Sequence, residues 1–179
     1  ITPTVNYFIG LPLPEAVRAQ LAAVTDALPV PAARLRREPR EKLHCTLLFL
    51  GPQPDDRLPA MTGLLAPAPL PAGLVLTLNG LGAFPSPARA RVLWAGFTVS
   101  PALAGLQERL ATAAVAAGFA VDSRPFVPHV TLARSGRTPV TLDAICGMVP
   151  ATGSFPVTEV VLWRSRRGTY ERCAAAGIC

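Results

Sequence analysis

Apolar residues follow two different patterns along the chain. Short runs rich in β-branched, aromatic and leucine side chains predict strands at residues 4–10, 43–50, 74–81, 91–99, 126–133, 155–164 and 169–175. Apolar residues at three- and four-residue intervals predict helices over residues 14–28 and 101–117, and the second helix would bury Leu103, Leu106 and Leu110. Ser100 is a suitable N-cap for that helix, and Gly118 is a suitable stop.

The order of these elements predicts an α+β fold. Strands and helices interleave, but several strands are joined by short turns, which favours antiparallel sheets over a doubly wound parallel sheet. The chain has neither a GxGxxG nor a GxxxxGK[ST] motif, so nothing indicates a dinucleotide-binding fold or a P-loop. A length of 179 residues suits one domain, or two small lobes that share an interface.

The basic residues are almost all arginine. Lys and Arg number 17 against 11 Asp and Glu, which gives a net charge of +6, and Lys42 is the one lysine. Arginine suits phosphate because its planar side chain donates two parallel hydrogen bonds. A genome biased toward Arg, Ala and Pro would give the same composition, so charge alone does not establish a phosphate ligand.

Composition also bears on location. An apolar fraction of 50% argues against a disordered chain, and the uncharged stretch 58–88 is interrupted by prolines that a membrane-spanning helix would not tolerate. The first residues lack the basic region of a signal peptide. The four cysteines, Cys45, Cys146, Cys173 and Cys179, form no CxxC pair. We therefore expect a cytoplasmic monomer with reduced cysteines, no membrane association and no obligate protein partner.

The two histidines carry the clearest chemical signal. Each begins the same pattern, HCTL from His44 and HVTL from His129. Residues i and i+2 of a strand share a face, so each motif would present an imidazole beside a hydroxyl, with Cys45 turned into the packing. One histidine on a strand is usually a core residue with satisfied hydrogen bonds. The repetition of the pattern around every histidine of the chain instead favours a catalytic pair, one member in each of two similar lobes.

Two such strands facing each other across a cleft would suit proton transfer at a phosphate. Histidine titrates near pH 6.5, so one imidazole can take a proton from water while the other gives one to the leaving oxygen. The threonine hydroxyls would donate to the non-bridging oxygens, which hold charge in the transition state.

The segments around both motifs resemble a known family. LHCTLLFLG and RPFVPHVTLAR closely resemble the two signature motifs of the 2H phosphoesterase superfamily. YFIGLP, GLGAFPSPARARVLWAG and VVLWRSRRGTYE resemble other segments of its RNA 2′,3′-cyclic phosphodiesterase (2′-5′ RNA ligase) branch, in the expected order. The resemblance implies one bilobal domain over residues 1–179. Two pseudo-symmetric lobes, each an antiparallel sheet with flanking helices, would enclose a central cleft, with HxT motifs at 44–46 and 129–131.

The resemblance also implies an activity. Family members hydrolyse RNA 2′,3′-cyclic phosphate ends, typically to 2′-phosphates, without metal or cofactor, and some join RNA ends through 2′-5′ linkages. The partner would be RNA with such an end, or a cyclic nucleotide. His44 would be the general acid toward the O3′ leaving group and His129 the general base on water. Thr46, Thr131 and Arg134 would bind the phosphate.

The remaining candidates form the wall of the cleft. Arg134 is five residues after His129, an odd offset that would turn it away unless a bulge re-aims it. The resemblance makes Phe84 a platform for a nucleobase, although it could equally anchor its loop. Of Tyr7 and Phe8 on the opening strand, one would line the cleft while the other packs, and Tyr7 is taken as the cleft candidate. Ser165 and Tyr170 are further cleft candidates, although core or hairpin packing would explain them equally well. The polar stretch 36–38 differs from the more apolar family pattern, which leaves the nucleobase preference open.

Two other kinds of function compete with this one. A non-catalytic RNA-binding module could use the same basic cleft, and it would bind RNA without turnover. A zinc hydrolase would need about three protein ligands, and the two histidines lack a carboxylate or thiolate at ligand spacing. A Cys45 nucleophile is disfavoured because Cys45 should point away from the face of His44.

Overall fold

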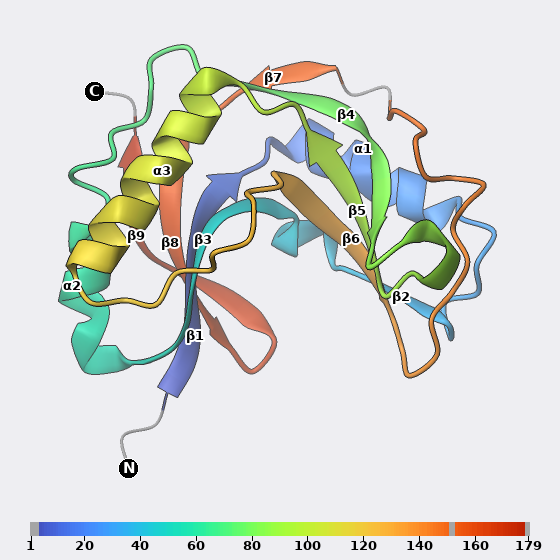
Figure 1. Cartoon of the computed structure of the whole chain (residues 1–179). Helices are drawn as coiled ribbons and strands as arrows, with labels where there is room; N and C mark the ends of the chain where they lie inside the picture. The colour runs from blue at the N-terminus through green and yellow to red at the C-terminus, as the bar shows by residue number, and fades with distance from the viewer. Residues whose placement is uncertain (1–3, 151–152, 178–179) are drawn as a thin grey trace.

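The structure, a computed structural model, describes residues 4–150 and 153–177. Its helices are α1 (Glu15–Asp26), α2 (Leu58–Gly63) and α3 (Pro101–Ala116). The strands are β1 (Thr4–Pro12), β2 (Leu35–Arg37), β3 (His44–Pro54), β4 (Val75–Phe84), β5 (Val92–Phe97), β6 (His129–Ser135), β7 (Ser154–Pro156), β8 (Glu159–Arg166) and β9 (Thr169–Gly177). Figure 1 shows how they are arranged.

The strands form a curved sheet in the order β7-β4-β5-β6-β3-β1-β8-β9, with β2 paired to β6. Every pairing is antiparallel, so the predicted α+β fold with antiparallel sheet is confirmed. Strands β3 and β6 pair at one position, Cys45 with Val130. The sheet therefore has two halves, and each half supplies one HxT strand at the junction.

The helices cross between these halves. α1 precedes β3 in the chain but packs against β6, and α3 precedes β6 but packs against β3 (Figure 1). Each helix therefore covers the half of the sheet that does not hold the next HxT strand. Strands from both ends of the chain, β1 with β8 and β9, lie together in one half. One cluster of buried apolar side chains runs through both halves. The lobes are therefore interleaved along the chain rather than being its consecutive halves.

The details of α3 agree with the sequence. Ser100 Oγ accepts a hydrogen bond from the backbone N–H of Leu103 at 3.1 Å, and the stripe of Leu103, Leu106 and Leu110 is fully buried. Gly118 follows the helix with φ +76°, a conformation that glycine adopts without strain. The predicted N-cap, buried stripe and stop of this helix are confirmed.

Two strand predictions differ from the structure. Residues 126–128 lie outside β6, because Pro125 and Pro128 have no N–H to donate to a neighbouring strand. The predicted strand 155–164 is divided: β7 pairs with β4, whereas β8 pairs with β1 in the other half of the sheet. The chain leaves one half after Pro156 and enters the other at Glu159.

None of the helices in the described part of the chain is long and apolar enough to cross a membrane. Cys45, Cys146 and Cys173 are free thiols, and Cys45 is fully buried. Cys179 lies outside the described residues.

Candidate active site

The two HxT motifs meet where β3 and β6 pair. Cys45 and Val130 face each other and are fully buried, so the histidines and threonines on either side of them project from the opposite face. An antiparallel register centred on this pair sets His44 beside Thr131 and Thr46 beside His129. All four line one cavity of about 200 Å³. The lining residues are Asn6, Phe8, Glu38, Lys42, His44, Thr46, Phe49, His129, Thr131, Arg134, Ser165 and Tyr170.

Both imidazoles are held in the same way. Nδ1 of His44 lies 2.6 Å from the carbonyl oxygen of Lys42, and Nδ1 of His129 lies 2.7 Å from that of Val127. A carbonyl oxygen only accepts, so each Nδ1 carries a proton and donates it. Nε2 of His44 lies 2.9 Å from the hydroxyl oxygen of Thr46. Nε2 is therefore the atom of each ring that can exchange a proton with a ligand.

Burial disfavours the charged form of both histidines. It lowers the pKa of His44 below the usual 6.5; the hydrogen bond to Lys42 and the carboxylate of Glu38 act in the opposite direction. Burial also lowers the pKa of His129, against the hydrogen bond to Val127, and the charge of Arg134 lowers it further. The charge of His129 also acts to lower the pKa of His44.

A bulge turns Arg134 into the cavity. On β6, Thr131 pairs with Trp94 and Ala133 with Leu93, so Leu132 is an extra residue. Leu132 and Ala133 are both buried, and the alternation resumes with Arg134 on the face of His129. The bulge that the odd offset requires is present, and Arg134 lies where a phosphate in the cavity can meet it.

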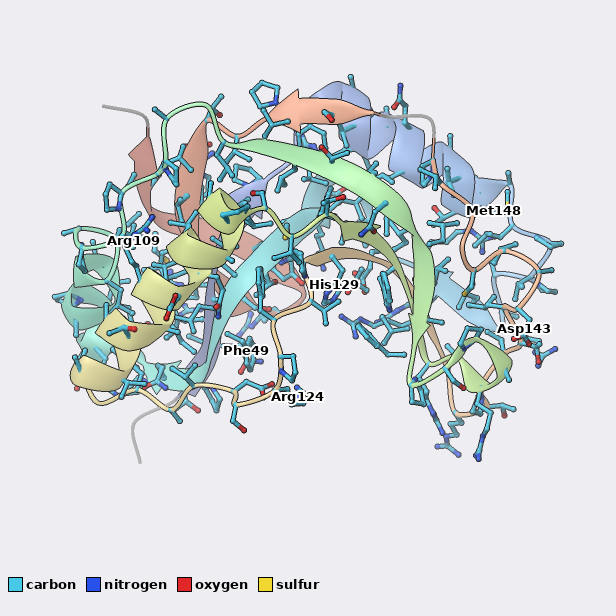
Figure 2. The ribbon with its side chains drawn as sticks, turned by 45° about the horizontal axis from the view of Figure 1, so that its top comes forward. Phe49, Arg109, Arg124, His129, Asp143 and Met148 are labelled. Atoms are coloured by element: carbon cyan, nitrogen blue, oxygen red, sulfur yellow. The ribbon has the colours of Figure 1, made fainter. Side chains whose placement is uncertain are left out.

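The same irregularity occurs in β3. Thr46 pairs with Gly10 and Leu48 with Ile9, which leaves Leu47 as the extra residue. Leu47 and Leu48 are both buried, and Phe49, at the same offset from His44 as Arg134 from His129, faces the cavity and is 54% exposed. Figure 2 shows Phe49 and His129 at the centre of the molecule. Residues 44–48 of β3 and 129–133 of β6 thus share one pattern of cavity-facing and buried side chains. The next residue that faces the cavity is aromatic on β3, Phe49, and cationic on β6, Arg134.

Aromatic rings surround both histidines. Phe8 stacks on His44 with ring centroids 4.8 Å apart, and Tyr170 meets His44 edge-on at 5.4 Å. Phe84 meets His129 edge-on at 5.2 Å and lines a second, larger cavity of about 790 Å³. Thr46, Phe49, His129, Thr131 and Arg134 line both cavities. Phe84 therefore lies beside the cavity that both HxT motifs line rather than in it.

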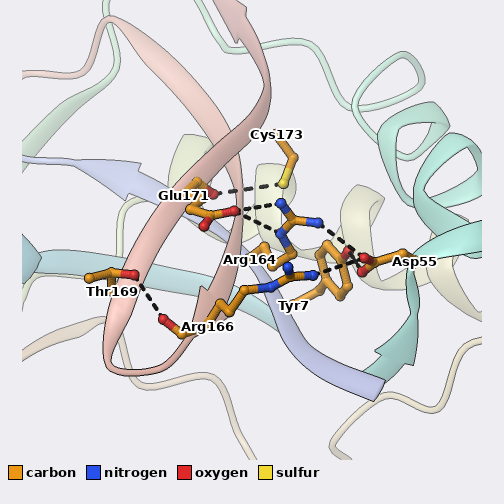
Figure 3. Close-up of polar contacts among 7 residues, drawn as sticks. All are labelled: Tyr7, Asp55, Arg164, Arg166, Thr169, Glu171 and Cys173. Carbon is orange, nitrogen blue, oxygen red and sulfur yellow. Dashed lines mark hydrogen bonds and ion pairs between the residues drawn. The ribbon is translucent and has the colours of Figure 1, made fainter. Parts of the chain in front are cut away.

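The assignment of Tyr7 to the cleft is wrong. Tyr7 is 0% exposed, and its hydroxyl donates to Asp55 Oδ1 at 2.6 Å on the opposite face of β1 (Figure 3). Phe8, its neighbour on the strand, lines the cavity instead, because successive side chains alternate between faces. Asp55 also pairs with Arg164 and Arg166 of β8.

Ser165 and Tyr170 lie where the cleft prediction placed them. They are cross-strand partners on β8 and β9 and line the same cavity as the two histidines. In the part of the chain that the structure describes, no three His, Cys, Asp or Glu side chains are grouped as metal ligands.

The family model of the 2′-5′ RNA ligase superfamily matches residues 13–169. The chain belongs to this superfamily. The RNA 2′,3′-cyclic phosphodiesterase of Geobacillus stearothermophilus is 31% identical over 176 residues, 95% of this chain but 56% of that protein, so the chain spans little more than half the length of this relative. The enzyme of the same name from Escherichia coli K12 is 33% identical over 162 residues, 88% of this chain and 85% of its own.

A solved structure shares the fold of this superfamily member. Escherichia coli LigT complexed with 3′-AMP superposes with a TM-score of 0.79 at 28% identity, covering 98% of both chains. Four residues that line the cavity were not among the candidates from the sequence: Asn6, Glu38, Lys42 and Phe49. The signal for Phe49 was present, since it stands five residues after its histidine just as Arg134 does.

Proposed function

We propose that the protein hydrolyses RNA 2′,3′-cyclic phosphate ends to 2′-phosphate ends by a metal-independent mechanism with two histidines. The observation that carries this proposal is the shared cavity, in which His44, Thr46, His129 and Thr131 converge from two strands. The names of the Geobacillus and Escherichia relatives support the reaction, and the complex of LigT with 3′-AMP supports a nucleotide ligand for this fold.

The proton transfers follow from the ring orientations. Nε2 of His129 accepts a proton from water as the water oxygen attacks phosphorus. The bond from phosphorus to O3′ breaks, and Nε2–H of His44 gives its proton to the departing oxygen. The product carries a 2′-phosphate and a free 3′-hydroxyl. His129 then loses its proton to solvent and His44 regains one, which restores the starting state.

The other cavity residues stabilise charge during this step. The hydroxyls of Thr46 and Thr131 and the guanidinium of Arg134 donate to the non-bridging oxygens of the phosphate, where negative charge is held in the transition state. A 5′-hydroxyl of a second RNA in place of water would give a 2′-5′ linkage through the same transfers.

The family resemblance assigns His44 as the acid and His129 as the base. Burial lowers the pKa of both histidines; the carboxylate of Glu38 acts to raise that of His44, and the charges of His129 and Arg134 act to lower it. Because these effects oppose each other at His44, the assignment of the two roles rests on the family resemblance.

The larger cavity supports a nucleotide substrate. Phe49, Phe84 and Phe126 line it beside the catalytic groups. Stacking of one base on an aromatic side chain contributes about 1–3 kcal/mol and depends little on the base. An RNA end or a cyclic nucleotide could therefore place its phosphate between the histidines and its base against these rings.

The test is product analysis on an RNA oligonucleotide that ends in a defined 2′,3′-cyclic phosphate, in the presence of EDTA. We expect a mass gain of one water and a 2′-phosphate product. A 3′-phosphate product, or activity lost with the chelator, would overturn the proposed mechanism. RNA binding that weakens with salt and shows no turnover would instead indicate a binding module.

A further inference from the structure

Glu38 is the one carboxylate among the described residues that line the catalytic cavity. It follows β2, and its backbone N–H donates to the carbonyl of Leu132 at 2.8 Å, at the bulge of β6. Its side chain is 15% exposed. The residue is therefore fixed to the strand that carries His129 and Arg134, while its carboxylate faces the cavity.

A carboxylate in this place opposes the binding of an anion, because like charges repel more strongly where water is partly excluded. Its position is explained by what it contacts. Oε1 of Glu38 accepts a hydrogen bond from Nε of Arg134 at 2.9 Å. Since Nε is the atom used, the two terminal amino groups of Arg134 are left for the oxygens of a phosphate.

Glu38 also acts across the cleft on His44. Burial lowers the pKa of His44, the carbonyl of Lys42 and the carboxylate of Glu38 raise it, and the charges of His129 and Arg134 lower it. Other titratable side chains line the cavities on either side of this ring: Arg18, Glu41, Lys42, Glu159, Tyr170 and Arg172. Glu38 is the one carboxylate that shares the catalytic cavity with His44.

We propose that Glu38 is a positioning residue that holds Arg134 toward the phosphate site before substrate arrives and favours the charged form of His44 across the cavity that the three side chains share. Glu38 transfers no proton in the proposed reaction, so it acts through these two side chains. The inference rests on the proposed two-histidine function and adds a residue to it.

The first test is an NMR titration of the two imidazoles, which are the only histidines of the chain. Glu38→Gln removes the charge but keeps an oxygen that can accept from Arg134. We expect the midpoint of His44 to fall by about 0.5–1 pH unit, a 3–10-fold loss of proton affinity, and that of His129 to move less. An unchanged His44 midpoint would overturn the proposal. Glu108→Gln, an equal charge change on the exposed face of α3, should move neither histidine.

The second test separates the effect on Arg134. For 2′,3′-cyclic AMP, the limb of the kcat/KM profile that follows the His44 midpoint should move to lower pH in Glu38→Gln. Glu38→Ala should have a KM about 3–10-fold above that of Glu38→Gln, because it offers Arg134 no acceptor. This difference should vanish in an Arg134→Ala background, and its persistence there would overturn the Arg134 part. If wild-type protein shows no turnover, the proposed function fails, and the NMR titration still decides the role of Glu38 toward His44.

Discussion

Gly10 is the position where a single methyl group should disturb the site most. It lies on β1 opposite Thr46. A Cβ at Gly10 would lie 2.4 Å from the carbonyl oxygen of Cys45 and 3.2 Å from Cα of Thr46. Both are backbone atoms of the HxT strand, so no side-chain rotation can relieve the contact. Gly10→Ala must push β1 and β3 apart at the first HxT motif.

The size of the effect follows from this distance. Carbon atoms in ordinary contact are about 3.5–4.0 Å apart, so the strands must separate locally by about 1 Å. Overpacking of this kind costs about 1–3 kcal/mol. For a chain of this length each kcal/mol lowers Tm by about 2–4 °C, which gives a fall of about 2–12 °C. A displacement of about 1 Å in catalytic groups can reduce the rate about 100-fold.

The assay combines thermal unfolding with hydrolysis of 2′,3′-cyclic AMP. Gly63→Ala is the matched control, because Gly63 ends α2 and a Cβ there meets nothing within 4 Å. The control should keep the wild-type rate and an equal or slightly higher Tm. A Gly10→Ala protein with the Tm and rate of wild type would refute the argument from close strand approach.

Three other predictions concern groups in or near the site. His44→Ala and His129→Ala should each lose about 10²–10⁴-fold in rate, and full activity in either would exclude the two-histidine mechanism. Because burial lowers the pKa of both histidines, kcat/KM should be maximal below pH 6.5. The maximum of kcat should lie at higher pH, because a bound anion stabilises the charged rings. A kcat/KM maximum above pH 7 would contradict this prediction. The hydrogen bond from Tyr7 lowers the pKa of Asp55 below 3.8, so Asp55→Asn should have a lower Tm than wild type above that pH. The difference in Tm between the two proteins should disappear as pH falls through the lowered pKa. A difference in Tm that does not depend on pH would contradict this account.

The sequence predicted the placement of the HxT side chains better than the walls of the cavity. The period of two within each strand placed histidine and threonine on one face and Cys45 in the core, and burial indeed raises the pKa of that thiol to about 12. The repeated motif suggested that both strands face one cavity. These features depend on short spacings, which a sequence displays directly.

What the sequence could not provide depends on distant pairing. Tyr7 and Phe8 are adjacent aromatic residues, and the register of β1 with β3 and β8 decides which of them faces the cavity. The role of Glu38 arises from β2 pairing with β6, which brings it to Arg134 across a long sequence separation. The two bulges left a weak trace, since apolar pairs after each Thr break the alternation at Leu47 and Leu132.

The central claim is that two imidazoles from distant parts of the chain reach the same phosphorus atom. A crystal structure of the protein with adenosine 2′-phosphate tests it most directly. The account predicts one phosphate group with its oxygens about 2.6–3.2 Å from Nε2 of both His44 and His129, and within reach of both threonine hydroxyls. A phosphate that contacts one histidine alone, or that lies outside the cavity between them, would contradict it.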